Sequence, residues 1–286
     1  MQVGRTLWLS LAFRPESARH ARNMLRIAIW FMASAGLWLA GAVMPDGQRI
    51  GWWLAALALE YAGPFAFFRV PGLGHSTAGD WDISPSHMAE RCGLFIIIAL
   101  GEGIVVIGSS VAHGGLSAGL IGAMALAFTG SALMWWLYFD LGADRGQRFM
   151  SAHDQPGRIA RNAYTYLHMP IVAGVILAAV GDSLLIEHWD EPALTSLIAM
   201  QCGGTMLFLA AMGLFKRYSS PRGNFPMSHT VAFAALALLG GIGLWLGIRA
   251  LDLAAGVALV LLLACVWEWG SFHGGWLERY RALRQA

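Results

Sequence analysis

The sequence has little charge, and this absence excludes a soluble globular protein. Only 13% of its 286 residues are charged, and 57% are apolar; soluble domains average roughly 25% charged residues. The mean hydropathy is +0.56. The formal net charge is only +2, so there is no basic excess to bind nucleic acid, and we expect no nucleic-acid partner.

Signatures of catalysis and of metal binding are also missing. The three cysteines lie in apolar runs without metal-ligand spacing or a disulfide framework. The segment HMAER lacks the second histidine of the zinc metalloprotease motif, and no phosphate-binding glycine loop occurs. We therefore expect no enzyme, no cofactor and no metal site.

Long apolar runs are what the sequence has in abundance. Each is about 20 residues long, enough to cross a hydrocarbon core of roughly 30 Å, and each is continuous, unlike the alternating strands of a β-barrel. The predicted fold is an all-α, polytopic bundle of about eight transmembrane helices, at 25–44, 50–69, 87–111, 117–140, 164–185, 193–215, 228–248 and 252–271. This divides the chain into an N-terminal segment with part of a helix (1–24), the bundle (25–271) and a tail (272–286).

The positions of the basic residues predict the orientation. Lys216 is the single lysine among 19 basic residues, and nearly all of these residues fall in alternate connections. Cytoplasmic loops carry the excess of Lys and Arg, so both termini are expected to be cytoplasmic, in the inner membrane of a bacterium. The basic groups used are Arg5, Arg14, Arg19, Arg22, Arg69, Arg145, Arg148, Arg158, Arg161, Lys216, Arg217, Arg222, Arg279, Arg281 and Arg284.

The third predicted helix carries ionisable residues inside an apolar run. Glu102 lies near its middle, where a charge costs at least about 2.5–3.5 kcal/mol. Arg91 and Glu102 are about 20° apart around the axis but roughly 16 Å apart along it, so they share a face without pairing. His87 lies on the same side, and Glu90 points elsewhere. A polar row leading to the midplane predicts an ion, proton or substrate path; the alternative is a set of structural hydrogen bonds and helix-end anchors.

Two prolines predict irregular backbone near other buried polar groups. Pro64 cannot donate a hydrogen bond to the carbonyl of Glu60, and Pro170 leaves that of Tyr166 free beside His168. Free carbonyls at membrane depth persist only where protein or water covers them. We therefore predict a polar interior near Glu60 and His168, although a buried histidine with satisfied hydrogen bonds is the simpler interpretation of His168.

One helix carries a resemblance to a known family. HMAERCGLFIIIALGEGIVVIG (87–108) resembles the signature helix of the bacterial low temperature requirement protein A family, and RNAYTYLHMPIVAGVILAAVGDSLL resembles a later helix of that family. Two departures stand out. Gly103 replaces the serine that usually follows the midplane glutamate, and the first helix of the family, with a phrase like ELFFDLVFV, is absent. The resemblance thus implies a chain that begins within the family pattern, without its N-terminal helices.

Two functions remain open from the sequence. The first is movement of an ion, a proton or a small solute through the bundle by way of Glu102, Glu60, Arg91, His87, Glu90 and His168. The second is a membrane scaffold or sensor that transports nothing, in which these groups only join helices. The expected partner is the lipid bilayer, and a homo-oligomer is left open.

Overall fold

The structure is a computed structural model that describes residues 1–77, 84–111, 117–140, 146, 159–219 and 224–272. The regular elements of these residues are all helices, with two isolated β-bridges at Val70–Gly74 and Pro192–Arg249. The prediction of an all-α fold is confirmed. The contacts divide the chain into two compact units, Met1–Ile83 and Ser84–Ala286.

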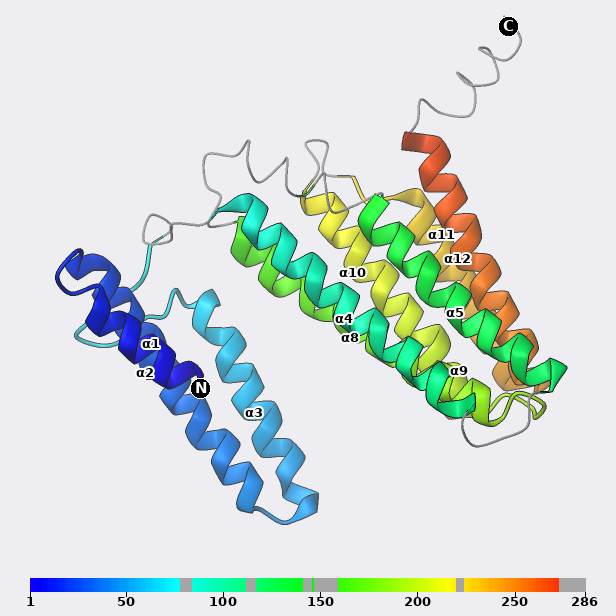
Figure 1. The fold of residues 1–286 in the computed structure, drawn as a ribbon, viewed down its shortest axis with the longest axis horizontal. Coiled ribbons are helices and arrows are strands. Elements are labelled where there is room, and N and C mark those ends of the chain that lie inside the picture. Colours follow the sequence, from blue (N-terminus) through cyan, green and yellow to red (C-terminus); the bar gives the residue numbers. More distant parts are fainter. Residues whose placement is uncertain (78–83, 112–116, 141–145, 147–158, 220–223, 273–286) are drawn as a thin grey trace, which may run out of the picture. The chain divides into compact units, whose positions relative to one another are not determined.

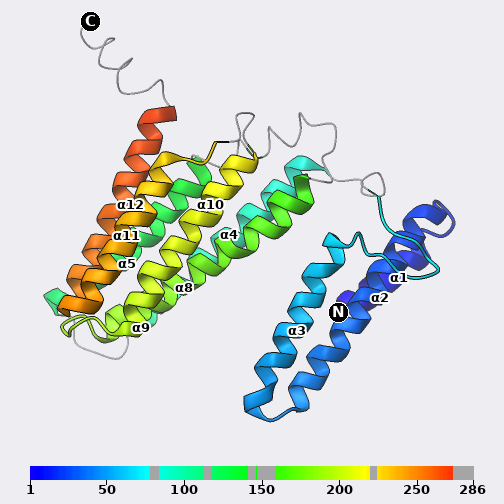
Figure 2. The same cartoon turned by 180° about the vertical axis from the view of Figure 1, so that it is seen from behind.

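Unit 1 is a layer of three helices, drawn from blue to cyan in Figures 1 and 2. The helix α1 (Gln2–Ala12) packs on α2 (Ala18–Val43), and α2 packs on α3 (Asp46–Phe65). The side chain of Ser17 accepts a hydrogen bond from the backbone of His20 and caps α2. The first two turns of α2 are polar, so the apolar run begins only after them. A prediction from hydropathy alone therefore placed the start of this helix at residue 25, seven residues after its start at Ala18.

The end of α3 shows what Pro64 does. It occupies the last turn, one residue before the helix ends at Phe65, so the hydrogen bond that it cannot donate is missing at the end of the helix and not in its middle. The chain then turns through Phe67 and Phe68, with φ angles of 52° and 47°, which are unusual for bulky residues. The backbone of Phe68 donates to the carbonyl of Gly63 at 2.8 Å, and its ring packs edge-on against Trp30. Packing therefore holds the strained turn in place.

Unit 2 is a helical bundle. Its helices are α4 (Pro85–Val111), α5 (Ala118–Tyr138), α8 (His168–Glu187), α9 (Thr195–Ile198), α10 (Gly204–Tyr218), α11 (Met227–Leu246) and α12 (Ala250–Phe272). The helix α8 contacts α4, α5, α10 and α12. A π-helical turn, η3 (Ala160–Leu167), leads into α8, and a second, η4 (Ala199–Gly203), joins α9 to α10.

Small residues let α8 and the η4–α10 helix touch backbone to backbone. A Cβ atom placed on Gly174 would lie 2.5 Å from the backbone nitrogen of Phe208, and one on Gly204 would lie 2.7 Å from that of Ala178. A Cβ on Gly181 would lie 2.5 Å from Cγ of Gln201. Close approach through small residues is a principal way in which helices associate in lipid.

Each of the eight predicted helices is present as a helix, with ends within four residues of the predicted ones except the start of α2, which lies seven residues earlier. Within the described residues, six helices are long and apolar enough to cross a membrane: Ala18–Val43, Ala118–Tyr138, Ala160–Glu187, Thr195–Tyr218, Met227–Leu246 and Ala250–Ser271. The multi-pass membrane fold is thus supported. Eight crossings and the cytoplasmic termini stay predictions.

Candidate functional site

The predicted polar row lies on one open side of α4. His87, Glu90, Arg91 and Glu102 are all exposed, and no ion pair joins any of them to another described residue. Ile98, one turn before Glu102, is 68% exposed. The opposite side of α4 packs into the bundle through residues such as Gly103. The shared face inferred from the helical spacing is present, and the described residues of unit 2 leave it uncovered.

Glu60 lies in unit 1 and is held by two donors. The Ser34 hydroxyl donates to Oε1 of Glu60 at 2.5 Å, and the Trp38 indole donates to the same oxygen at 3.0 Å. Ser34 is buried and Glu60 is half-buried. These hydrogen bonds tie α2 to α3 and stabilise a carboxylate in an apolar setting.

His168 is a buried histidine with both ring nitrogens satisfied. Nδ1 lies 2.9 Å from the carbonyl of Ala163, and Nε2 lies 2.9 Å from the hydroxyl of Tyr138. Because a carbonyl only accepts, Nδ1 carries the proton and Nε2 accepts from Tyr138. The ring also stacks on Tyr164, with centroids 5.1 Å apart. This geometry fits the simpler interpretation of His168, a structural group that joins α5 to α8.

A different polar group lies in the centre of unit 2. Asp182 is 8% exposed and accepts a hydrogen bond from Nε2 of Gln201 at 3.0 Å. Both residues line a cavity enclosed by α4, α5, α8, η4, α10 and α12, together with the hydroxyl residues Ser131 and Thr205. The rest of its lining is apolar and mostly small. The space in which the centre of a water-sized sphere fits inside this cavity is about 20 Å³.

Sequence patterns alone did not single out Asp182, because the predicted helix 164–185 puts it in the last turn, where interfacial water would solvate a carboxylate. The helix α8 continues to Glu187, so Asp182 lies more than one turn inside it. A usable signal was Gln201, a polar side chain within an otherwise apolar predicted span, since intramembrane polar groups face protein or water.

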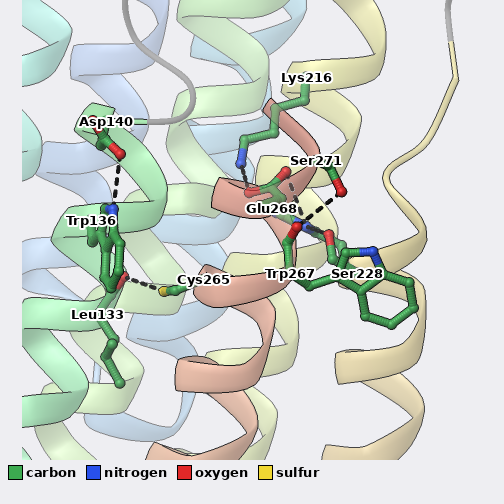
Figure 3. A network of polar contacts seen from close by, with 10 residues as sticks. Leu133, Trp136, Asp140, Lys216, Ser228, Cys265, Trp267, Glu268 and Ser271 are labelled. Carbon is green, nitrogen blue, oxygen red and sulfur yellow. Dashed lines mark hydrogen bonds and ion pairs between the residues drawn. The ribbon is translucent and has the colours of Figure 1, made fainter. Parts of the chain in front are cut away.

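A second buried cluster joins the last three helices (Figure 3). Nζ of Lys216 lies 2.5 Å from Oε2 of Glu268, with both side chains buried. Nδ1 of His229, which is fully buried, lies 3.8 Å from Oε1 of Glu268. The cluster thus links α10, α11 and α12 through the single lysine of the chain. About one turn before Glu268 on α12, the Cys265 thiol donates a hydrogen bond to the carbonyl of Leu133 in α5.

Within the described ranges there is no group of three or more His, Cys, Asp or Glu side chains that could hold a metal ion by themselves.

The match to known proteins covers most of the chain. A family model described as bacterial low temperature requirement A protein matches residues 1–266. The chain belongs to this family. An uncharacterized protein of Rhizobium meliloti (strain 1021) is 34% identical over 269 residues, which cover 94% of this chain.

The low temperature requirement A resemblance is therefore confirmed for the chain as a whole. The chain spans 65% of the length of the Rhizobium meliloti relative. No solved structure matches it, so the site has to be interpreted from its own geometry.

Proposed function

We propose that this low temperature requirement A protein moves an ion or a small solute across the cytoplasmic membrane of a bacterium, through the interior of unit 2. The observation that carries the proposal is the buried carboxylate of Asp182 on a water-sized cavity. Buried ionisable groups in membrane bundles commonly mark ion pathways and proton relays.

The surroundings of Asp182 support a path more than a purely structural bond. A structural carboxylate would be surrounded by donors, as Glu60 is by Ser34 and Trp38. Among the described residues Asp182 instead has one amide donor, and it adjoins a mostly apolar cavity that also carries the hydroxyl residues Ser131 and Thr205. Gly103 is the point at which α4 reaches the cavity. Glu102, Arg91, His87 and Glu90 lie on the open side of α4 and do not line the cavity, so this proposal places the path at Asp182 and not along the predicted polar row.

The second candidate is a scaffold or sensor that transports nothing, and two observations favour it. His168 has both ring nitrogens satisfied, and Lys216 pairs with Glu268. Groups bonded in this way fix helices in one arrangement without carrying anything. In this view Asp182 and Gln201 are a further tie between α8 and η4.

Flux in proteoliposomes separates the two candidates. Vesicles with the purified protein are loaded with a pH-sensitive dye, or with Na⁺ or K⁺, and the decay of each imposed gradient is followed. We expect one gradient to collapse with the wild type and to persist with Asp182→Asn.

The control is Asp252→Asn, because Asp252 is exposed and pairs with exposed Arg249 at 2.9 Å. It should behave as wild type. Flux in the Asp182→Asn vesicles equal to wild type would remove Asp182 from the path. No flux with any probe, together with a loss of thermal stability in Asp182→Asn, would favour the scaffold.

A further inference from the structure

We propose that the central cavity of unit 2 binds one dehydrated alkali-metal cation, held by Asp182 and Gln201 with the hydroxyls of Ser131 and Thr205. This deepens the proposed function and rests on it, since it names the class of ion that would occupy the path.

The contact with Asp182 fixes the orientation of the Gln201 amide. A carboxylate accepts hydrogen bonds and donates none, so the contact of 3.0 Å to Asp182 requires the amide nitrogen on that side. The amide oxygen, Oε1, then points elsewhere. It is buried and has no hydrogen-bond partner among the described residues. A buried amide acceptor without a donor is costly, and a cation next to it would remove that cost.

The lining of the cavity carries one ionisable group. Asp182 is the single ionisable residue among those that line the cavity, and no ion pair joins it to another described residue. A buried carboxylate needs a proton or a cation to compensate its charge. One negative charge balances one monovalent cation.

The size of the cavity excludes occupants much larger than a water molecule. About 10–15 Å³ of space for the probe centre holds one water molecule, and the cavity offers about 20 Å³. Na⁺ and K⁺ without their hydration shells are no larger than water. An organic solute does not fit. Ca²⁺ needs six to eight oxygen ligands, and Mg²⁺ keeps several waters.

The donor set fits the same class. A carboxylate, an amide oxygen and hydroxyls are hard oxygen ligands, which suit cations that bind without thiolate or imidazole. Gln201 lies in the π-helical turn η4, and such turns are frequent at functional sites because they redirect side chains out of regular register.

Equilibrium binding tests the site without any transport. The full chain in detergent is titrated with NaCl and with KCl, against choline chloride at equal ionic strength, and thermal unfolding and calorimetric heat are recorded between pH 6 and 9. We expect a saturable rise in melting temperature with Na⁺ or K⁺ that choline does not give. Asp182→Asn should weaken the affinity at least tenfold, and Asp252→Asn should leave it unchanged.

Thr205→Val is the second variant, because it keeps the shape of a residue that is 1% exposed and removes only its hydroxyl. It should weaken binding severalfold in a folded protein, even if Asp182→Asn does not fold. Equal response to Na⁺, K⁺ and choline would overturn the cation site and leave protons as the compensating charge. Alkali-ion binding without flux would support the cation site and refute transport. Flux without alkali-ion binding would support transport and refute the cation site.

Discussion

Replacement of Gly174 by alanine tests the contact on which the interior of unit 2 depends. Gly174 lies on α8 against the backbone of α10. The Cβ of an alanine there would lie 2.5 Å from the nitrogen of Phe208 and 2.8 Å from the carbonyl oxygen of Gly204. Ordinary contacts begin at 3.4 Å, so the helices must separate by about 3.4 − 2.5 = 0.9 Å. Both obstructing atoms are main-chain atoms, which cannot rotate away.

The size of the effect follows from two opposing contributions. Overpacking of a close contact costs about 1–3 kcal/mol. Alanine is the better helix former by about 1 kcal/mol, which offsets part of that cost. We expect Gly174→Ala to lower the free energy of unfolding by up to about 2 kcal/mol. The same separation would open the cavity, because Asp182 and Gln201 lie on the same pair of helices.

Unfolding in mixed micelles with increasing SDS, followed by circular dichroism, measures this difference. The matched control is Gly241→Ala in α11, where no atom lies within 4 Å of an added Cβ. It should be neutral or stabilising by up to about 1 kcal/mol. If both variants unfold at the same SDS fraction, the backbones of α8 and α10 are not in contact and the reasoning fails.

Two further substitutions test other features of the bundle. Lys216→Met should destabilise by about 3–5 kcal/mol because it removes the cation that pairs with the buried carboxylate of Glu268. Adding Glu268→Leu should recover most of the loss in the same SDS titration, and a double variant as unstable as the single one would contradict a paired role. Gly247 ends α11 with φ of +60°, so Gly247→Ala should cost about 1–2 kcal/mol, and Gly247→Asn should cost less in thermal unfolding; an alanine variant as stable as wild type would argue against the left-handed turn.

The sequence predicted most helices because an apolar run is a local property. The predicted start of α5 also coincides with its cap, Ser117, whose side chain accepts a hydrogen bond from the backbone of Leu120. The sequence did not predict the start of α2, where a cap and polar residues precede the apolar run, or that α3 would end at Phe65, directly after Pro64. Nor did it predict the π-helical turns, because an extra residue per turn leaves the composition unchanged.

The candidate site could be predicted only in part, because burial depends on which face of a helix packs. Helical spacing placed Glu102, Arg91 and His87 on one side of α4, and the described residues of unit 2 leave that side open. Asp182 and Gln201 are 19 residues apart and meet only when α8 turns back along η4. Lys216 and Glu268 are 52 residues apart, and no local pattern indicates such a partner.

The π-helical turn η4 makes the length of its helix as important as its composition. A π turn holds one residue more than the α-helical turn it replaces. Deletion of a single residue from Ala199–Gly203 would let the segment relax into regular α-helix. Everything before Gly204 would then rotate by about 100° and slide by about 1.5 Å relative to α10. Gln201 would leave Asp182, although every chemical group needed for the site would still be encoded in the chain.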